Sequence, residues 1–157
     1  MSKLLRNELI HMVVTFLAAG LYFFVSQNVA HTLIFIICAV GVDADHLFDY
    51  VRYIHQSKSK ATILGFLSGK YFHLSNRLFV LLHSWELSLI GLWLYFTGIG
   101  AVYLPIALGL ATHYLVDSMT NDVGFLSYFF SVRVAHQFKL NKIVNNVPDR
   151  FDNIIHL

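Results

Sequence analysis

Long apolar blocks alternate with short polar segments along this chain. The four blocks are residues 9–25, 29–42, 78–96 and 99–116, each interrupted by only a few polar side chains. A helix that crosses a membrane needs about 20 mostly apolar residues. Three blocks qualify directly, and the second does so if it continues into the polar sequence DADH. The pattern therefore predicts an all-α integral-membrane bundle of four transmembrane helices, over about 8–26, 29–47, 77–97 and 99–120.

Composition supports a membrane protein of one domain. The chain has 157 residues, of which 57% are hydrophobic and 13% are charged, and its mean hydropathy is +0.62. A soluble domain is about 45–50% apolar and about 25% charged. We therefore expect a single transmembrane domain over residues 1–157, with a cytoplasmic connection at 48–76 and a cytoplasmic or interfacial tail at 121–157.

The basic residues predict the orientation of this bundle. They lie before the first block, between the second and third, and after the fourth: Lys3, Arg6, Arg52, Lys58, Lys60, Lys70, Arg77, Arg133, Lys139, Lys142 and Arg150. The connections at 26–28 and 97–100 have none. The positive-inside rule then places both termini in the cytoplasm. This topology accounts for the net charge of +2, so nothing indicates binding of nucleic acid.

Ionisable side chains gather near the cytoplasmic end of every predicted span. They are His11 in the first span, Asp43, Asp45 and His46 in the second, His83 and Glu86 in the third, and His113 and Asp117 in the fourth. Residues three or four apart share a helix face, which pairs His83 with Glu86 and His113 with Asp117. Charged groups in a bilayer cost roughly 2.5–3.5 kcal/mol each on insertion scales, and they usually mark function.

A divalent metal is the simplest explanation for this set. Imidazole and carboxylate ligands together suit zinc, manganese or iron. Eight candidates exceed the four ligands that one zinc takes, so we expect one or two ions, with zinc as the expected metal. Other interpretations stay open. The His–carboxylate pairs could be hydrogen-bonded contacts between helices, DADH could be a solvated loop, and His83 with His113 could be axial ligands of a haem.

The ordered set of motifs resembles a known family, the predicted membrane-bound, metal-dependent hydrolases of bacteria and archaea, some of which are LexA-regulated inner-membrane proteins. The matching positions are His11, the D-x-D-H at 43–46, His83-Ser84, and the H-x-x-x-D-x-x-T at 113–120 followed by Gly124. They cover most of the chain. The sequence departs from the family in having Val42 where a proline is usual and in lacking an H-R-G ahead of His83.

The resemblance implies metal-dependent hydrolysis. A bound metal lowers the pKa of its water to about 7, and Asp45 or Glu86, whichever does not bind metal, would act as general base. Arg77 or a loop lysine would bind a phosphate, and the resemblance also implies the inner membrane as the location. The depth of the site suits a phospholipid or another lipid-linked phosphoester. The alternative is a membrane protein that binds or transports metal without catalysis.

Overall fold

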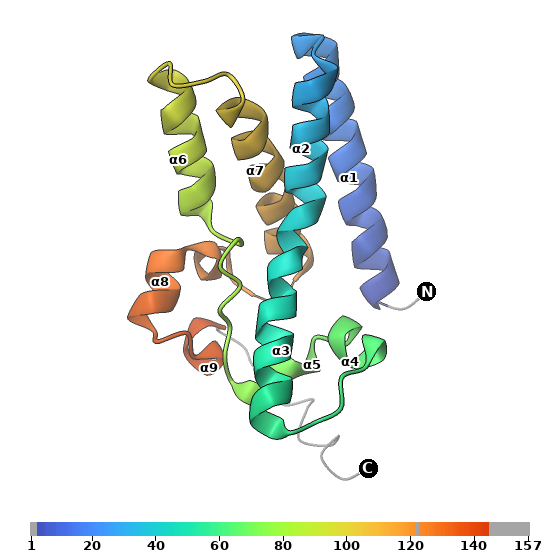
Figure 1. Cartoon of the computed structure of the whole chain (residues 1–157), viewed down its shortest axis with the longest axis vertical. Coiled ribbons are helices and arrows are strands. Elements are labelled where there is room, and N and C mark those ends of the chain that lie inside the picture. The colour runs from blue at the N-terminus through green and yellow to red at the C-terminus, as the bar shows by residue number, and fades with distance from the viewer. Residues whose placement is uncertain (1–2, 122, 145–157) are drawn as a thin grey trace.

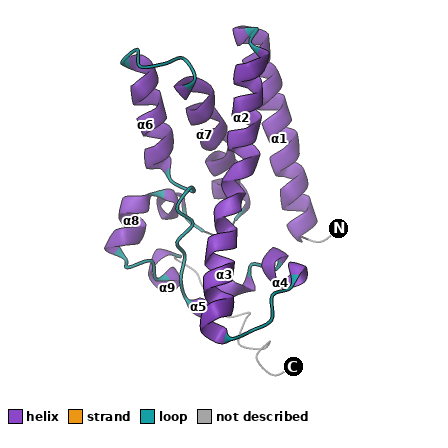
Figure 2. Ribbon diagram, in the orientation of Figure 1, coloured by secondary structure: helices purple, strands orange, loops and turns teal. Residues whose placement is uncertain are grey.

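The computed structural model describes residues 3–121 and 123–144. In this part of the chain there are helices and loops but no β-strands (Figure 2). Four helices stand side by side (Figure 1): α1 (Lys3–Ser26), α2 (Val29–Gly41), α6 (Trp85–Phe96) and α7 (Tyr103–Thr120). The prediction of an all-α chain is confirmed for these residues.

Helix α7 is the centre of the bundle, since it packs against α1, α2 and α6. Small residues set its distance from its neighbours. A methyl group added at Gly109 would collide with the backbone oxygen of Phe35 in α2, and one added at Gly91 in α6 would lie 3.0 Å from Cβ of Ala107. Small residues at helix crossings allow such close approach of two backbones. The α2–α7 crossing matters for the site, because α7 carries His113 and Asp117 and α2 leads directly into the residues that carry Asp43.

The second predicted span is longer than expected and changes its geometry in the middle. Helix α2 passes into a 3₁₀ turn, η1 (Val42–Asp45), and then into α3 (His46–Ser57). The turn coincides with the acidic sequence, and 3₁₀ stretches within helices often mark functional positions. Asp45 immediately precedes α3 and Asp49 lies in its first turn. The dipole of α3 favours negative charge at this end, which offsets part of the cost of the carboxylates.

Two stretches of the described chain are long and apolar enough to cross a membrane, Leu9–Ser26 and Val29–Ser57. They correspond to the first two predicted spans, although the second extends into the predicted connection at 48–76. Helix α6 has 12 residues and α7 has 18. The four-helix membrane topology and the cytoplasmic position of the termini remain predictions.

The third predicted span differs from the structure. Residues 76–84 are not helical, and α6 begins only at Trp85. The apolar pattern could not reveal this, because the backbone groups of this segment are bound by side chains that are distant in sequence. The carboxylate of Asp49, for example, accepts hydrogen bonds from the backbone N–H groups of Phe79 and Val80. His83 and Glu86 consequently do not share a helix face.

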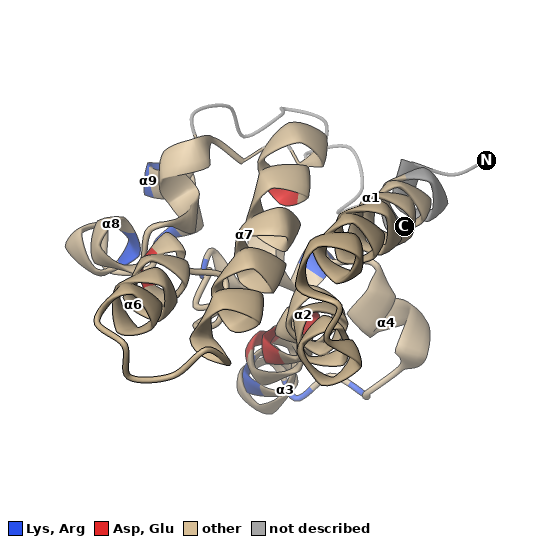
Figure 3. Ribbon diagram, turned by 90° about the horizontal axis from the view of Figure 1, so that it is seen from above, with Lys and Arg blue, Asp and Glu red and all other residues tan. Residues whose placement is uncertain are grey.

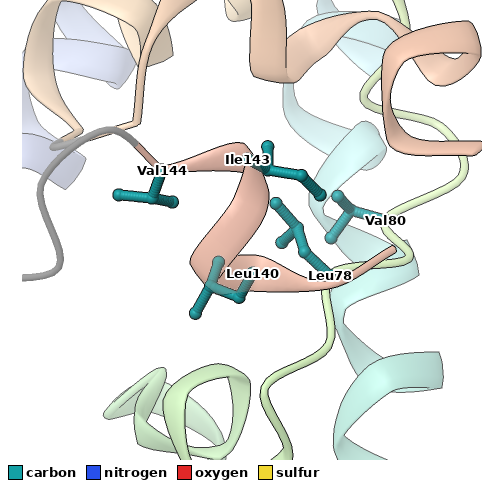
Figure 4. Packing of buried hydrophobic residues seen from close by; sticks show 5 residues of the cluster. All are labelled: Leu78, Val80, Leu140, Ile143 and Val144. Atoms are coloured by element: carbon teal, nitrogen blue, oxygen red, sulfur yellow. The ribbon is translucent and has the colours of Figure 1, made fainter. Parts of the chain in front are cut away.

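Short helices fill the end of the bundle where α3 lies (Figure 1): α4 (Ile63–Leu67), α5 (Lys70–Ser75), η2 (Phe125–Tyr128), α8 (Phe130–Ala135) and α9 (Leu140–Ile143). A small apolar core joins the segment 76–84 to α9 (Figure 4). It consists of Leu78, Val80, Leu140, Ile143 and Val144. The predicted connection and tail therefore meet at one end of the molecule. Residues 122 and 145–157 of the predicted tail lie outside the described residues.

Charged residues also gather at the end of the molecule that holds α3 and the short helices. Seen from above (Figure 3), the upper turns of α1, α2 and α6 carry no charged residues, and the coloured positions lie toward the other end. The connections α1–α2 and α6–α7, which lack lysine and arginine, form the uncharged end. This asymmetry agrees with the pattern on which the predicted topology was based.

Candidate metal centre

Two buried histidines face each other at the centre of the polar cluster. The Nε2 atoms of His83 and His113 are 3.2 Å apart, and each residue is only 2% exposed. Asp43 Oδ1 lies 3.3 Å from Nε2 of His83 and 3.5 Å from Nε2 of His113. Asp117 Oδ2 lies 3.5 Å and 3.4 Å from the same two atoms. Four atoms with lone pairs, from η1, the segment 76–84 and α7, thus converge on one point.

The remaining ring nitrogen of each histidine is held from behind. Nδ1 of His113 donates to the carbonyl oxygen of Ala39 in α2 at 2.8 Å. A carbonyl can only accept, so this bond places the proton on Nδ1 and leaves the lone pair of Nε2 toward the cluster. Nδ1 of His83 lies 3.0 Å from Oδ1 of Asp45. A carboxylate or carbonyl behind the ring is the usual support of a metal-binding histidine, since it fixes both tautomer and orientation.

Two further histidines flank the centre. Nε2 of His11 in α1 lies 3.0 Å from Oδ1 of Asp117, and Nε2 of His46 lies 3.7 Å from Oδ1 of Asp43. Among the described residues, two groups offer ligand atoms that all lie within 4.8 Å of one another: His11, His113 and Asp117, and Asp43, His46 and His83. These groups could hold a metal ion.

The central distances match those of a tetrahedral site. Where metal–ligand bonds are about 2.0–2.1 Å, as for zinc with imidazole or carboxylate, neighbouring ligand atoms in a tetrahedron lie about 3.3–3.4 Å apart. The five distances measured among the two Nε2 atoms and the oxygens of Asp43 and Asp117 run from 3.2 to 3.5 Å. Side chains at these distances could hold a metal ion.

Two tyrosines near the cluster, outside the apolar stretches, have pKa values raised by burial and by nearby carboxylates. Burial, followed by the charges of Asp49 and Asp45, raises the pKa of Tyr71 in α5 well above its usual range. Burial, followed by the charge of Asp117, does the same to the pKa of Tyr128 in η2. A negative potential opposes the formation of a phenolate. The same potential attracts a cation to the point between the carboxylates.

Asp45, predicted as a ligand or general base, lies behind His83. Its Oδ1 faces Nδ1 of that ring, and its Oδ2 accepts the backbone N–H of Leu82 at 2.7 Å. It belongs to neither group of potential ligand atoms. The structure thus places Asp45 as the support of a ligand rather than as a ligand.

The structure does not bring Glu86 to the cluster. Its carboxylate accepts the backbone N–H groups of Phe130 and Ser131, both at 2.9 Å, and the hydroxyls of Ser84 and Ser131, both at 2.7 Å. These bonds satisfy the first N–H groups of α8, which a helix cannot satisfy internally. The hydrogen bonds of Glu86 therefore connect the start of α6 to the start of α8.

Arg77, predicted to bind phosphate, is also engaged elsewhere. Its Nη1 donates to the backbone carbonyl of Gln137 at 2.6 Å, and its backbone pairs with Lys139 in an isolated bridge. The residue therefore fastens the segment 76–84 to the region of α9.

Sequence reasoning missed the residues that shape this segment. Arg133 is fully buried and donates to the carbonyls of Val80 and His83, both at 2.8 Å. Tyr114 donates its hydroxyl proton to the carbonyl of Leu82. Together with Asp49 and Asp45, these side chains fix the backbone around His83, although this backbone is not helical. The only signal in the sequence was a single arginine inside the otherwise apolar run that follows Gly124.

A second supporting residue, Asn121, could have been found from spacing. It lies four residues after Asp117, and its Nδ2 donates to Oδ1 of that carboxylate at 2.9 Å. Because His11 approaches the same oxygen, Oδ2 is left to face the two central histidines. Asn121 thus fixes the orientation in which Asp117 could bind a metal.

No family model, curated protein or solved structure matches the chain. The fold and the site define it as a helical protein with two helices able to cross a membrane and with a buried His–Asp cluster that could hold a metal ion.

Proposed function

We propose that this chain is an integral-membrane, metal-dependent hydrolase that acts on a phospholipid or another lipid-linked phosphoester. One observation carries the proposal. His83 and His113 direct Nε2 at the same point as two carboxylates, and both rings are held from behind by an acceptor. Buried ionisable groups inside an apolar bundle are costly and usually serve function.

The main alternative is a cluster without metal, in which hydrogen bonds and ion pairs alone join the histidines and carboxylates. If both rings are neutral, two lone pairs oppose each other at 3.2 Å, and if both are fully protonated, two N–H groups do. A single extra proton between His83 and His113 removes this conflict. A divalent cation removes it for the two carboxylates as well, which favours the metal-bound state. The two states differ in metal content, so they are separable by experiment.

The cluster accommodates either one or two ions. One ion would take the two central histidines with Asp43 and Asp117. Two ions would each take one of the two groups that include His11 and His46. Zinc fits the central distances best, and manganese or iron are compatible with the same donors.

A divalent ion held here would supply a water of lowered pKa and would polarise a phosphoryl oxygen. The chain's own groups do the rest. Asp43 and His46 form the open edge of the cluster, with side chains 49% and 32% exposed, whereas the central rings are buried. In the one-ion arrangement His46 is free to accept a proton from the attacking water at this edge. Asp45 keeps His83 in place throughout.

The position of the cluster supports the proposal of a lipid substrate. It stands where the apolar bundle meets the charged end of the molecule, between Leu9–Ser26 and the 3₁₀ turn of Val29–Ser57. A lipid phosphate at the membrane surface would reach this level, and the cation would recognise its charge.

The test uses the full-length protein purified in detergent and returned to vesicles. Samples loaded with zinc, manganese or iron are incubated with phosphatidylglycerol vesicles, and the phosphorus-containing products are followed by NMR. The proposal expects hydrolysis that disappears in His113→Ala and persists in His31→Ala, since His31 lies at the opposite end of α2. A metal-loaded protein that releases no product from this or other phospholipids would leave the non-catalytic binding protein as the better account.

A further inference from the structure

An apolar groove runs along the outside of the bundle beside the cluster. It lies between α1 and α7 and has a volume of about 600 Å³. Its walls come from 10–18 on α1 and 112–120 on α7. Each wall spans eight residue steps, or about 12 Å of helix. The groove is therefore elongated and runs with the helices.

The chemistry of the groove excludes a polar ligand along most of its length. Two of its lining residues, Thr112 and Thr120, carry hydroxyls, but both donate back to carbonyls of their own helix, Leu108 and Val116, at 2.8 and 2.9 Å. The other lining residues are apolar. A ligand in this groove meets hydrocarbon side chains.

The groove runs beside the level of the cluster. Ile10, next to His11 in the sequence, and Val116, next to Asp117, are among its lining residues. His11 and Asp117 bridge the same two helices at 3.0 Å. Further toward the charged end, Asn7 donates to the carbonyl of Thr120 at 3.3 Å. A long molecule in the groove would therefore pass close to a pair that belongs to the proposed metal site.

The surroundings of the groove favour lipid over protein. Only 11% of the apolar stretch Leu9–Ser26 is buried, and large side chains project outward along it, including Leu17 at 70% and Phe24 at 75%. Met119, at the rim of the groove, is 84% exposed. Hydrocarbon is the environment in which such a helix is stable. A groove on this surface is open to lipid chains along its length.

We propose that the groove between α1 and α7 holds the acyl chain of a membrane lipid, with the head group at the His11–Asp117 edge of the cluster. The position of the head group rests on the proposed function, whereas hydrocarbon in the groove does not. The groove would align a lipid so that the lipid phosphate meets the cluster. The length of the groove would favour lipids whose acyl chains match it.

The experiment labels the full-length protein in phosphatidylglycerol vesicles that contain a phospholipid with a diazirine in its acyl chain. After illumination, labelled peptides are mapped by mass spectrometry. We expect label in both 10–18 and 112–120. Met119→Trp, which puts an indole at the rim of the groove, should lower this label by roughly a factor of five by displacing methylene contacts. The matched control Leu21→Trp lies on an exposed face of α1 outside the groove and outside both measured segments, and it should leave the label unchanged.

Label spread evenly over the exposed faces of α1, or an equal loss in both variants, would overturn the proposal. Absence of label from both segments would do the same, because it would mean that protein, such as a second copy of this chain, covers the groove. Labelling requires neither metal nor turnover. A protein that is labelled in the groove but hydrolyses nothing would therefore contradict the proposed function alone.

Discussion

His113 and His83 present the same atom to the cluster from different surroundings. His113 lies within a regular helix, one turn after Gly109 and one turn before Asp117. His83 lies on the irregular segment 76–84, just before α6 begins. Both rings are equally buried.

The difference lies in what holds each backbone. Helix α7 satisfies its own N–H and C=O groups, so only the distance to α2 needs adjustment, and Gly109 provides it. The segment 76–84 has few internal backbone bonds, such as the one from His83 N–H to the carbonyl of Val80, and it depends on Asp49, Tyr114 and Arg133. Buried irregular backbone requires partners of this kind, because unpaired buried N–H and C=O groups are costly. We therefore expect the His83 side of the cluster to be the more sensitive to remote substitutions.

The largest effect should come from Arg133→Met, which removes both hydrogen bonds that hold the carbonyls of Val80 and His83. Losing two hydrogen bonds from a charged donor to buried carbonyls should cost about 3–5 kcal/mol of unfolding free energy, measured by denaturant titration in detergent. Arg77→Met is the matched control, since its guanidinium binds Gln137 in an exposed position, and it should cost less than about 1 kcal/mol. Equal losses in the two variants would mean that the segment does not depend on buried donors.

Gly109→Ala tests the helical side. The added methyl group meets the backbone oxygen of Phe35, which cannot move without shifting α2. The strain should cost about 2–3 kcal/mol, and the displaced helix should weaken the bond between His113 and Ala39. The control Gly20→Ala meets no atom within 4 Å and should stabilise α1 by up to about 1 kcal/mol through helix propensity. Thermal unfolding of both variants measures the contrast, and a stable Gly109→Ala protein would refute the close crossing.

Asp45→Asn keeps the size of the side chain but removes the charge behind His83. Loss of such a supporting carboxylate typically weakens metal binding by about 10–100-fold, or about 1.4–2.7 kcal/mol. Competition with a zinc chelator would measure the affinity. An Asp45→Asn protein that loses all its metal would instead show that Asp45 is itself a ligand, as the sequence first indicated.

The smallest effect on the cluster should come from Glu86→Gln. The amide can no longer accept bonds on both sides from α8 and Ser84, so stability should fall by about 1–2 kcal/mol. Metal content, measured by elemental analysis, should stay at the wild-type level. A clear fall in metal content would restore Glu86 to the set of ligands.

Much of the helical framework was predictable, because the apolar blocks are long and the turns between them are polar. The pairing of His113 with Asp117 and of Asp43 with His46 followed from helical spacing, and the structure places each pair within 3.7 Å. That His11 lies beside them followed only from the assumed shared depth, and its 3.0 Å approach to Asp117 agrees with it.

The start of α6 and the role of Glu86 were not predictable in the same way. Leu78 to Leu82 are as apolar as a helix in a bilayer, yet they pack on α9 and bond to Asp49, Asp45 and Tyr114. These contacts join residues more than 30 positions apart, so no local pattern reveals them. Glu86 has the spacing of a ligand partner to His83, but the loss of the helix before Trp85 turns it toward α8.

The most direct test of the metal centre is the metal content of the full-length protein purified in detergent, by elemental analysis. We expect one or two divalent ions per chain in the wild type and in His31→Ala, and almost none in His113→Ala or Asp117→Ala, whose side chains face His83 and Asp43. Metal removal should also lower thermal stability, because a ligand that binds only the folded state stabilises it. A wild-type protein that binds no divalent ion when zinc, manganese and iron are supplied, or variants that keep the full content, would contradict the account and leave a proton-linked contact between helices.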